Sequence, residues 1–188
     1  MNRMTITMFS LLVACTSSDD RPRTPEAKVS VERGQYLVST SGCHDCHTPF
    51  AIGPDGPAPD MTRALSGHPA QLVMPPAPTL PAGPWLVTVA ATNTAWSGPW
   101  GVSFTANLTP DGKTGLGSWT QQNFIDTIRN GRHMGAGRPL LPPMPAAMIA
   151  NMSDADLGSI YAYLRTVPAI ENRVPEPIAP GPTQVTVK

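Results

Sequence analysis

The residues of this chain whose types and spacing most clearly indicate a chemical function are Cys43, Cys46 and His47. They form a Cys-x-x-Cys-His run. Two thiols three residues apart, followed directly by an imidazole, are typical of covalent haem attachment, in which each thiol adds across a vinyl group to form a thioether. The histidine is then held beneath the porphyrin, where a ring nitrogen can ligate the iron. The run predicts one covalently bound haem c, with all three residues binding the cofactor and His47 ligating the metal.

Two other kinds of site use a Cys-x-x-Cys pair. A thioredoxin-like dithiol lies between a strand and a helix in a βαβ unit, and no such strand pattern precedes Cys43. A structural zinc site needs four ligands, usually from a second Cys/His pair. The one other cysteine is Cys15, so zinc would have to recruit scattered histidines: His44, His68 and His133. Haem attachment fits the pattern better than either alternative.

The sixth position on the iron decides between electron transfer and ligand chemistry. A thioether there closes the iron to outside ligands, whereas an open position permits ligand binding or peroxide chemistry. Met144 is the favoured ligand because prolines on both sides stiffen its loop and remove backbone donors near the sulfur. Met134 is the main alternative. The remaining candidates are four methionines and two histidines: Met61, Met74, Met148, Met152, His68 and His133.

Composition limits both the fold and the function. The 188 residues suit one domain with elaborations. Proline occurs 23 times and glycine 16 times, and this proline content is well above the usual share of roughly 5%. Much of the chain must therefore be irregular. The 13 Lys and Arg residues balance the 13 Asp and Glu residues, so nothing indicates a nucleic-acid-binding surface.

The N-terminus carries targeting signals. Residues 1–14 resemble a secretion signal, because Arg3 gives a positive start to an apolar run too short to span a membrane. The sequence Leu-Val-Ala-Cys at 12–15 resembles a bacterial lipobox, which predicts lipidation of Cys15. Residues 15–28 are polar and predict a disordered tether. We expect a lipid anchor on the periplasmic side of the cell envelope, the compartment of haem c attachment, with the outer membrane slightly favoured. An ordinary secretion signal or a misassigned start codon are the alternatives.

Apolar periodicity predicts three helices. The first covers 29–42 and ends just before the Cys-x-x-Cys-His run. The second opens near Ser118 and Thr120, either of which can cap it, and stops at Asn130-Gly131. The third begins at Ser153 and ends before Pro168.

Two further segments are rich in proline. Residues 50–117 predict an elaborated loop region that can include a small β-hairpin, with strands at 85–90 and 102–105. Residues 169–188 predict an extended or mobile tail.

This order of elements resembles class I cytochrome c over residues 29–168. Four stretches are more specifically similar to the c-type cytochrome subunits that accept electrons from bacterial dehydrogenases: 107–111, 115–117, 138–145 and 161–165. The resemblance implies an all-α cytochrome c fold whose first and last helices cross where a glycine meets an aromatic residue. The matching positions are Gly34 or Tyr36 on the first helix and Ile160 and Tyr163 on the last.

The resemblance implies a monohaem cytochrome, not itself an enzyme, that carries single electrons between a dehydrogenase or respiratory complex and another carrier or oxidase. Many such relatives carry several haems, but this chain has one Cys-x-x-Cys-His run. One alternative is a ligand-binding or peroxidase-like protein with an open iron, using His133 with Arg132 or Arg138. Another is a fixed electron-transfer subunit of a dehydrogenase complex, which would expose an apolar face around the tryptophan segment.

One local excess of positive charge comprises Arg129, Arg132, His133 and Arg138. Guanidinium groups pair well with carboxylates such as the haem propionates. We therefore treat a propionate contact from one of these arginines as a hypothesis, although a solvated loop is the commoner use of such charges.

Overall fold

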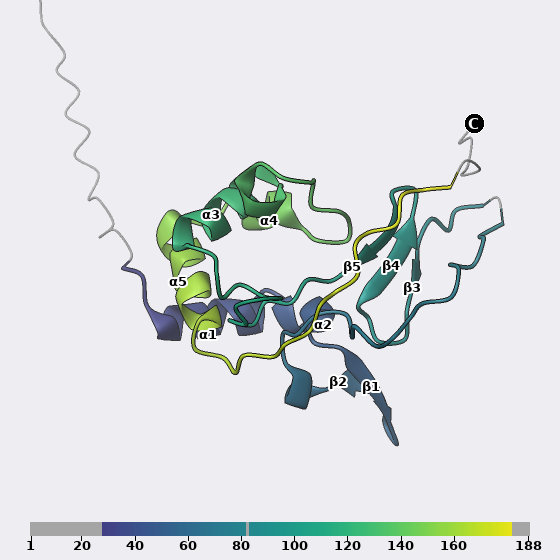
Figure 1. The fold of residues 1–188 in the computed structure, drawn as a ribbon, viewed down its shortest axis with the longest axis horizontal. Coiled ribbons are helices and arrows are strands. Elements are labelled where there is room, and N and C mark those ends of the chain that lie inside the picture. Colours follow the sequence, from purple (N-terminus) through teal and green to yellow (C-terminus); the bar gives the residue numbers. More distant parts are fainter. Residues whose placement is uncertain (1–27, 82, 182–188) are drawn as a thin grey trace, which may run out of the picture.

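A computed structural model describes residues 28–81 and 83–181 of the chain (Figure 1). The predicted signal, Cys15 and all but the last residue of the predicted tether lie outside these ranges. The helices of the described part are α1 (Val31–Thr40), α2 (Cys43–His47), α3 (Gln121–Asn130), α4 (Ala146–Ile149) and α5 (Asp154–Leu164), with short 3₁₀ turns at Met61–Arg63 and His133–Gly135. Within these residues no helix combines the length and the apolar character needed to cross a membrane.

The three longer helices begin at polar caps. The Ser30 hydroxyl accepts from the Arg33 N–H at the start of α1, and Ser153 accepts from the Asp156 N–H at the start of α5. Thr120, and not Ser118, caps α3 through a reciprocal capping box with Asn123. These bonds satisfy backbone donors that have no partner inside the helix.

Helices α1 and α5 cross in close contact at Gly34. A methyl group at Gly34 would overlap the backbone carbonyl of Ser159 and lie 2.8 Å from the Tyr163 Cβ. Beside this contact the Arg33 Nε donates to Asp156 at 2.8 Å. The predicted crossing at Gly34 is confirmed, whereas Tyr36 is 59% exposed and lies outside it. The absence of a side chain at Gly34 therefore sets how closely the two helices approach.

The prediction of an all-α fold is wrong, because the described chain also forms two small antiparallel sheets. One is a hairpin of β1 (Phe50–Gly53) and β2 (Gly56–Pro59). The other contains β3 (Thr88–Val89), β4 (Ala95–Gly98) and β5 (Gly101–Phe104) in that order.

Turn chemistry explains both sheets. Two-residue turns that begin with proline, Pro54-Asp55 and Pro99-Trp100, join β1 to β2 and β4 to β5. The glycine after each turn has a positive φ, 104° at Gly56 and 93° at Gly101, which glycine adopts without steric cost. The expected strand at 85–90 contains β3 and the one at 102–105 overlaps β5, but β3 and β5 do not pair with each other. Instead β4 lies between them and pairs with both.

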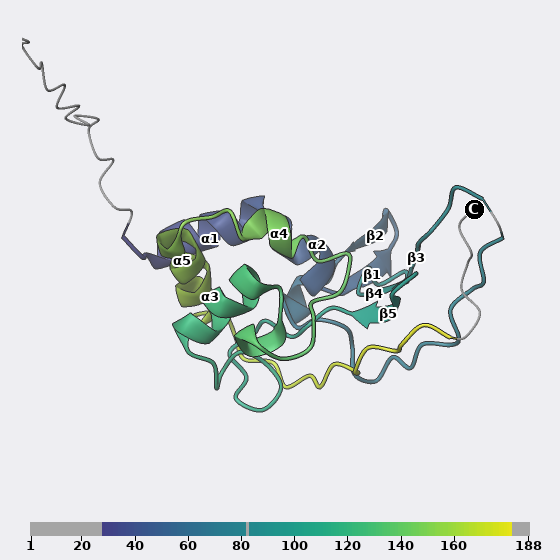
Figure 2. The same ribbon diagram turned by 90° about the horizontal axis from the view of Figure 1, so that it is seen from above.

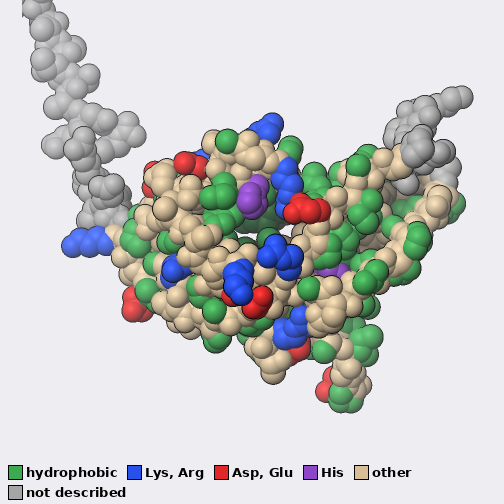
Figure 3. Space-filling model, in the orientation of Figure 1, with side chains coloured by type: hydrophobic (Ala, Val, Ile, Leu, Met, Phe, Trp, Pro, Cys, Tyr) green, Lys and Arg blue, Asp and Glu red, His purple; other side chains and the backbone are tan. Residues whose placement is uncertain are grey.

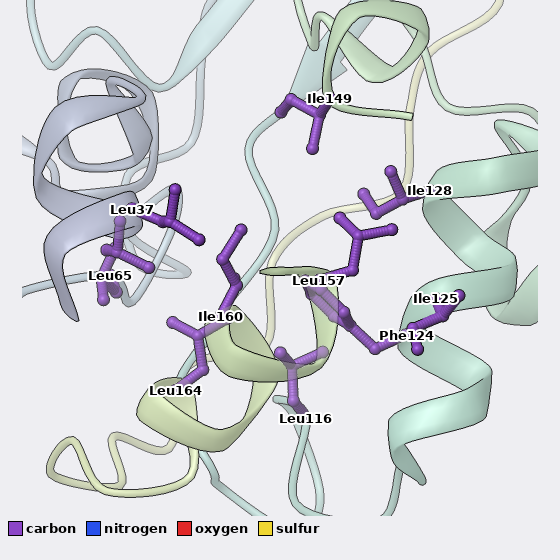
Figure 4. Close-up of a cluster of buried hydrophobic side chains, with 11 residues drawn as sticks. Leu37, Leu65, Leu116, Phe124, Ile125, Ile128, Ile149, Leu157, Ile160 and Leu164 are labelled. Carbon is purple, nitrogen blue, oxygen red and sulfur yellow. The ribbon is translucent and has the colours of Figure 1, made fainter. Parts of the chain in front are cut away.

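The hydrophobic core lies among α1, α3 and α5. Figure 4 shows Leu157, Ile160 and Leu164 of α5 between Leu37 on one side and the α3 side chains on the other. The loop residue Leu65 is fully buried in the same cluster. The remaining buried members come from α1, α3, α4 and the loop before α3: Val38, Leu116, Phe124, Ile125, Ile128 and Ile149.

After α5 the chain returns across the molecule in an extended conformation (Figures 1 and 2). Residues 169–178, called the strap below, end at an isolated antiparallel bridge between Ile178 and Val102 of β5. The Val102 N–H donates to the Ile178 carbonyl at 2.8 Å, and the Ile178 N–H donates back at 2.9 Å. Asn172 within the strap is buried. The strap thus connects the helical part of the molecule to the three-stranded sheet.

Candidate functional site

A cavity of about 1070 Å³ opens on the face shown in Figure 3. Its walls come from α2, the end of β5 with the loop after it, α3, the 138–145 loop, α5 and the strap. This volume lies just above the range of roughly 300–1,000 Å³ that most small-molecule and cofactor sites occupy. Cys43, Cys46, His47 and Met144 all line it. The structure thus brings together the four residues that the sequence assigns to the cofactor.

The two cysteines lie on one turn of α2. Residues three and four apart in a helix share a face, so Cys43, Cys46 and His47 can address the same side. Burial raises the pKa of the Cys43 thiol to about 11, and burial likewise raises the pKa of Cys46. Both thiols are free and remain protonated at neutral pH. His44, on the same turn, contacts Thr48 through Nδ1 at 2.9 Å and is not part of the cavity wall.

The ring of His47 is oriented by a single backbone contact. Its Nδ1 lies 2.8 Å from the carbonyl oxygen of Ala106. A carbonyl oxygen can only accept, so Nδ1 carries the proton and Nε2 keeps its lone pair. Burial lowers the pKa of His47, which favours the neutral imidazole that a metal ligand must be. Such a hydrogen bond from the second ring nitrogen is the usual way to orient a ligating histidine.

The cavity wall includes three of the candidate methionines: Met134, Met144 and Met152. Met61, Met74 and Met148 are not among its lining residues. Met134 is 44% exposed, whereas Met144 and Met152 are partly buried against the hydrophobic core. The structure therefore reduces the methionine candidates for a sixth ligand to these three.

The loop that carries Met144 is fastened to β5. The Ser103 hydroxyl donates to the Pro142 carbonyl at 2.6 Å, and the Trp100 Nε1–H donates to the Ser103 oxygen at 3.3 Å. The Met144 N–H also donates to the Leu141 carbonyl at 3.3 Å. These contacts give the proline-rich loop a fixed support, and nothing in the local sequence around Ser103 indicates this role.

The other candidate histidines separate in the structure. His68 is fully buried, with Nδ1 2.9 Å from the Thr94 hydroxyl and Nε2 3.0 Å from the Leu72 carbonyl, so both nitrogens are engaged. His133 lines the cavity and meets the Trp119 ring edge-on, with 5.1 Å between ring centroids. Within the described residues no three His, Cys, Asp or Glu side chains are grouped to hold a metal ion. Within the part of the chain that the structure describes, the histidines that the zinc alternative required therefore do not complete a metal site with Cys43 and Cys46.

The predicted cluster of positive charge is divided. Arg129 points away from the cavity wall to the start of α5, where it bonds the Met152 carbonyl at 2.8 Å and Asp154 at 2.5 Å. Arg132 also lies outside the wall. Arg138 lines the cavity and pairs with Glu176 of the strap at 3.5 Å. Two further cations outside the predicted cluster, Lys113 and Arg173, line the same cavity.

Comparison with known proteins adds independent information. No family model matches the chain. A nicotinate dehydrogenase subunit of Pseudomonas putida is 34% identical over 145 residues, which are 77% of this chain and 9% of that protein. The fructose dehydrogenase cytochrome subunit of Gluconobacter japonicus is 28% identical over 160 residues, covering 83% of this chain and 26% of the relative. The gluconate 2-dehydrogenase cytochrome c subunit of Pantoea cypripedii is 27% identical over 133 residues, which are 71% of this chain and 22% of that protein.

The chain spans about a quarter or less of the length of these curated relatives. Several of them are nonetheless named as cytochrome subunits of dehydrogenases, and each match covers most of this chain. Over most of its length the chain is therefore similar to the cytochrome subunits of bacterial dehydrogenases, which supports a cytochrome c-like family.

Proposed function

We propose that this protein transfers single electrons through one haem c bound covalently in the cavity. Cys43 and Cys46 would form the two thioethers that attach the haem, and His47 and Met144 would ligate its iron. When bound, the haem supplies a one-electron redox couple, and the residues around it set its potential. The electrons come from a dehydrogenase or respiratory complex and pass to another carrier or an oxidase. Lipidation of Cys15 holds the protein on the periplasmic side of the cell envelope.

One observation carries this proposal. The cavity is lined by two protonated thiols, a neutral imidazole with a free Nε2 lone pair, and a thioether in a fastened loop. This set of donors fits a haem, which the two thiols would attach and which the imidazole and the methionine sulfur would ligate. The similarity to cytochrome subunits of dehydrogenases supports the same role from an independent direction.

The test is whether porphyrin stays attached to the chain when the axial bonds are broken. Protein expressed with the haem c maturation machinery is expected to keep its porphyrin in acidified acetone and to give a c-type spectrum on reduction. The double variant Cys43→Ser/Cys46→Ser is expected to release all porphyrin in the same solvent, because no thioether remains. Thr40→Ser on the exposed side of α1 is the matched control. A colourless wild-type protein, or one that loses its porphyrin in the solvent, contradicts the proposal.

A second candidate function is a fixed subunit of a dehydrogenase complex, and the surface around β3 favours it. No Asp, Glu, Lys or Arg occurs between Arg63 and Asp111. In this stretch Val73 is 86% exposed and Trp85 is 77% exposed. Leu86, Val87 and Val89 are exposed beside them, with Ile178 of the strap. Figure 3 shows hydrophobic side chains gathered on this side of the molecule.

Exposed apolar patches that lack charge are typical of permanent interfaces. One member of this surface, Ile178, adjoins the cavity wall, because Pro177 lines the cavity and Ile178 bonds Val102 next to Ser103 in the wall. We commit to the catalytic subunit of a dehydrogenase as the occupant, since the relatives are named as subunits of such enzymes. A partner on this surface lies close to the cofactor.

The double variant Val73→Ser/Trp85→Ser tests this surface. We expect it to fold and to retain the wild-type spectrum, because exposed substitutions usually change stability by no more than about 0.5 kcal/mol. At native expression levels, the wild type is expected to copurify with a protein that mass spectrometry identifies as a dehydrogenase catalytic subunit. The double variant is expected not to copurify with it. Ile52→Ser on the separate β1–β2 hairpin, 75% exposed, is the control and should keep the partner. Self-association of the wild type that the double variant abolishes, with no dehydrogenase subunit bound, counts against the assignment.

A further inference from the structure

The strap forms part of the cavity wall, although it follows the last helix. Five consecutive strap residues, 173–177, line the cavity. They are positioned by Asn172, which is 5% exposed. Its side-chain oxygen accepts from the Ala70 N–H at 2.8 Å, and its Nδ2 donates to the Ser66 carbonyl at 2.7 Å and the His68 carbonyl at 2.8 Å. The whole side-chain amide of Asn172 is thus bonded to residues 66–70.

A second buried asparagine, Asn107, also bonds the strap. The Asn107 Nδ2 donates to the Ile170 carbonyl at 2.8 Å and to the Thr114 hydroxyl at 3.2 Å. The Thr114 hydroxyl in turn accepts from the Asn172 N–H at 3.0 Å. Asn107 Oδ1 accepts from both the backbone and the hydroxyl of Thr109. Asn107 and Asn172 therefore clamp one short piece of chain between two loops.

Both loops hold His47. The carbonyl of Ala106, next to Asn107, accepts from the His47 ring. The Gly67 N–H donates to the His47 carbonyl at 2.8 Å, and Gly67 lies between the two carbonyls that Asn172 binds. The two loops also bond each other, from the His68 N–H to the Thr105 carbonyl at 2.9 Å. The ring and the backbone of His47 are thus fixed by residues directly adjacent to those that the asparagines hold.

We infer that Asn107 and Asn172 are positioning residues for His47, and that the strap, through them, tunes the cofactor of the proposed cytochrome. The inference rests on the proposed function. Groups that orient a ligating histidine through its second ring nitrogen change ligand strength and redox behaviour without touching the metal. A buried, fully satisfied amide network gives such positioning rigidity. Loosening the strap also admits water to the cavity wall, which favours the more highly charged oxidised state of the cofactor.

The test uses the full-length holoprotein with covalently bound haem. Asn172→Ala is expected to shift the electron equilibrium about tenfold toward the oxidised form, a decrease in midpoint potential of about 59 mV for a one-electron couple. Asn107→Ala is expected to shift the potential too, and the double variant by less than the sum, because both residues act through one segment. Thr114→Val keeps the side-chain shape and removes the acceptor that joins the two asparagines. Thr114→Val is the variant to measure if an alanine variant does not fold. Its midpoint potential is expected to fall by less than that of Asn172→Ala.

Ile125→Ala separates positioning from simple loss of stability. Ile125 is 6% exposed in the core but is not part of the cavity wall, so this variant is destabilised while His47 is undisturbed. Its potential is expected to equal that of the wild type. If Asn172→Ala and Thr114→Val also keep the wild-type potential, the asparagines have a structural role alone and the inference is overturned. Failure of the wild type itself to bind haem overturns the proposed function instead, so the two failures are distinguishable.

Discussion

Replacing Met144 with alanine is expected to give a protein whose reduced form binds carbon monoxide rapidly, whereas the wild type resists it. Alanine has no donor atom to occupy the sixth position, so an outside ligand can reach it. The weak far-red absorption band of a thioether-ligated oxidised haem should disappear in the same variant. The midpoint potential is expected to fall, since a thioether ligand raises it. Carbon monoxide titration and the oxidised spectrum provide the measurements.

Met134→Ala and Met152→Ala are the matched controls, because these two methionines line the same cavity. Both should retain the far-red band and exclude carbon monoxide. Loss of the band in either control, with Met144→Ala unchanged, would assign the ligand to that residue. Rapid carbon monoxide binding by the wild type would instead support the ligand-binding or peroxidase-like alternative, in which His133 and Arg138 lie in the wall of an open site.

Replacing Gly34 with alanine is expected to destabilise the protein by about 3 kcal/mol or more. Alanine improves the helix propensity of α1 by only roughly 1 kcal/mol, but its methyl group would overlap the Ser159 carbonyl. Since the obstacle is backbone, no change of rotamer can relieve it and α5 must move. Domains of this size have a total stability of roughly 5–15 kcal/mol, so the loss is a large part of the whole. Urea denaturation followed by circular dichroism measures it.

Gly112→Ala is the control for that substitution. A methyl group at Gly112 meets no atom within 4 Å, and its φ is not positive. The change should be neutral, or stabilising by about 0.4–1 kcal/mol through the unfolded chain. Equal stability of Gly34→Ala and the wild type would show that α1 and α5 do not cross as closely as described.

The cofactor run can be recognised in the sequence because the spacing that its chemistry requires is local. Cys43, Cys46 and His47 lie within one turn of helix, so spacing alone places them on one side. The Ala106 carbonyl that orients His47 lies 59 positions away and is a backbone atom, which leaves no trace in residue type. Asn172 carries no signal for a similar reason, since a buried asparagine and a tail asparagine look alike in sequence.

The error over fold class has a comparable origin. The turn at Pro54-Asp55 is visible in the sequence, but the strands on either side, such as Gly56–Pro59, contain glycine and proline and lack alternating apolar residues. These segments are strands because each pairs with a neighbouring segment, not because their residues have a high strand propensity. Residue pattern therefore locates the three longer helices and misses the short helices α2 and α4. It also misses β1, β2 and β4, whose pairing depends on tertiary contacts.

The uncharged stretch between Arg63 and Asp111 has a consequence for ionic strength. Association through that surface should be almost indifferent to added salt, because it offers no charge to screen. Approach to the cavity should depend on salt, because its wall carries three cations, Lys113, Arg138 and Arg173, beside Asp45 and Glu176. A salt titration of electron-transfer rates would thus distinguish a permanently bound donor on the apolar side from a diffusing acceptor at the charged cavity.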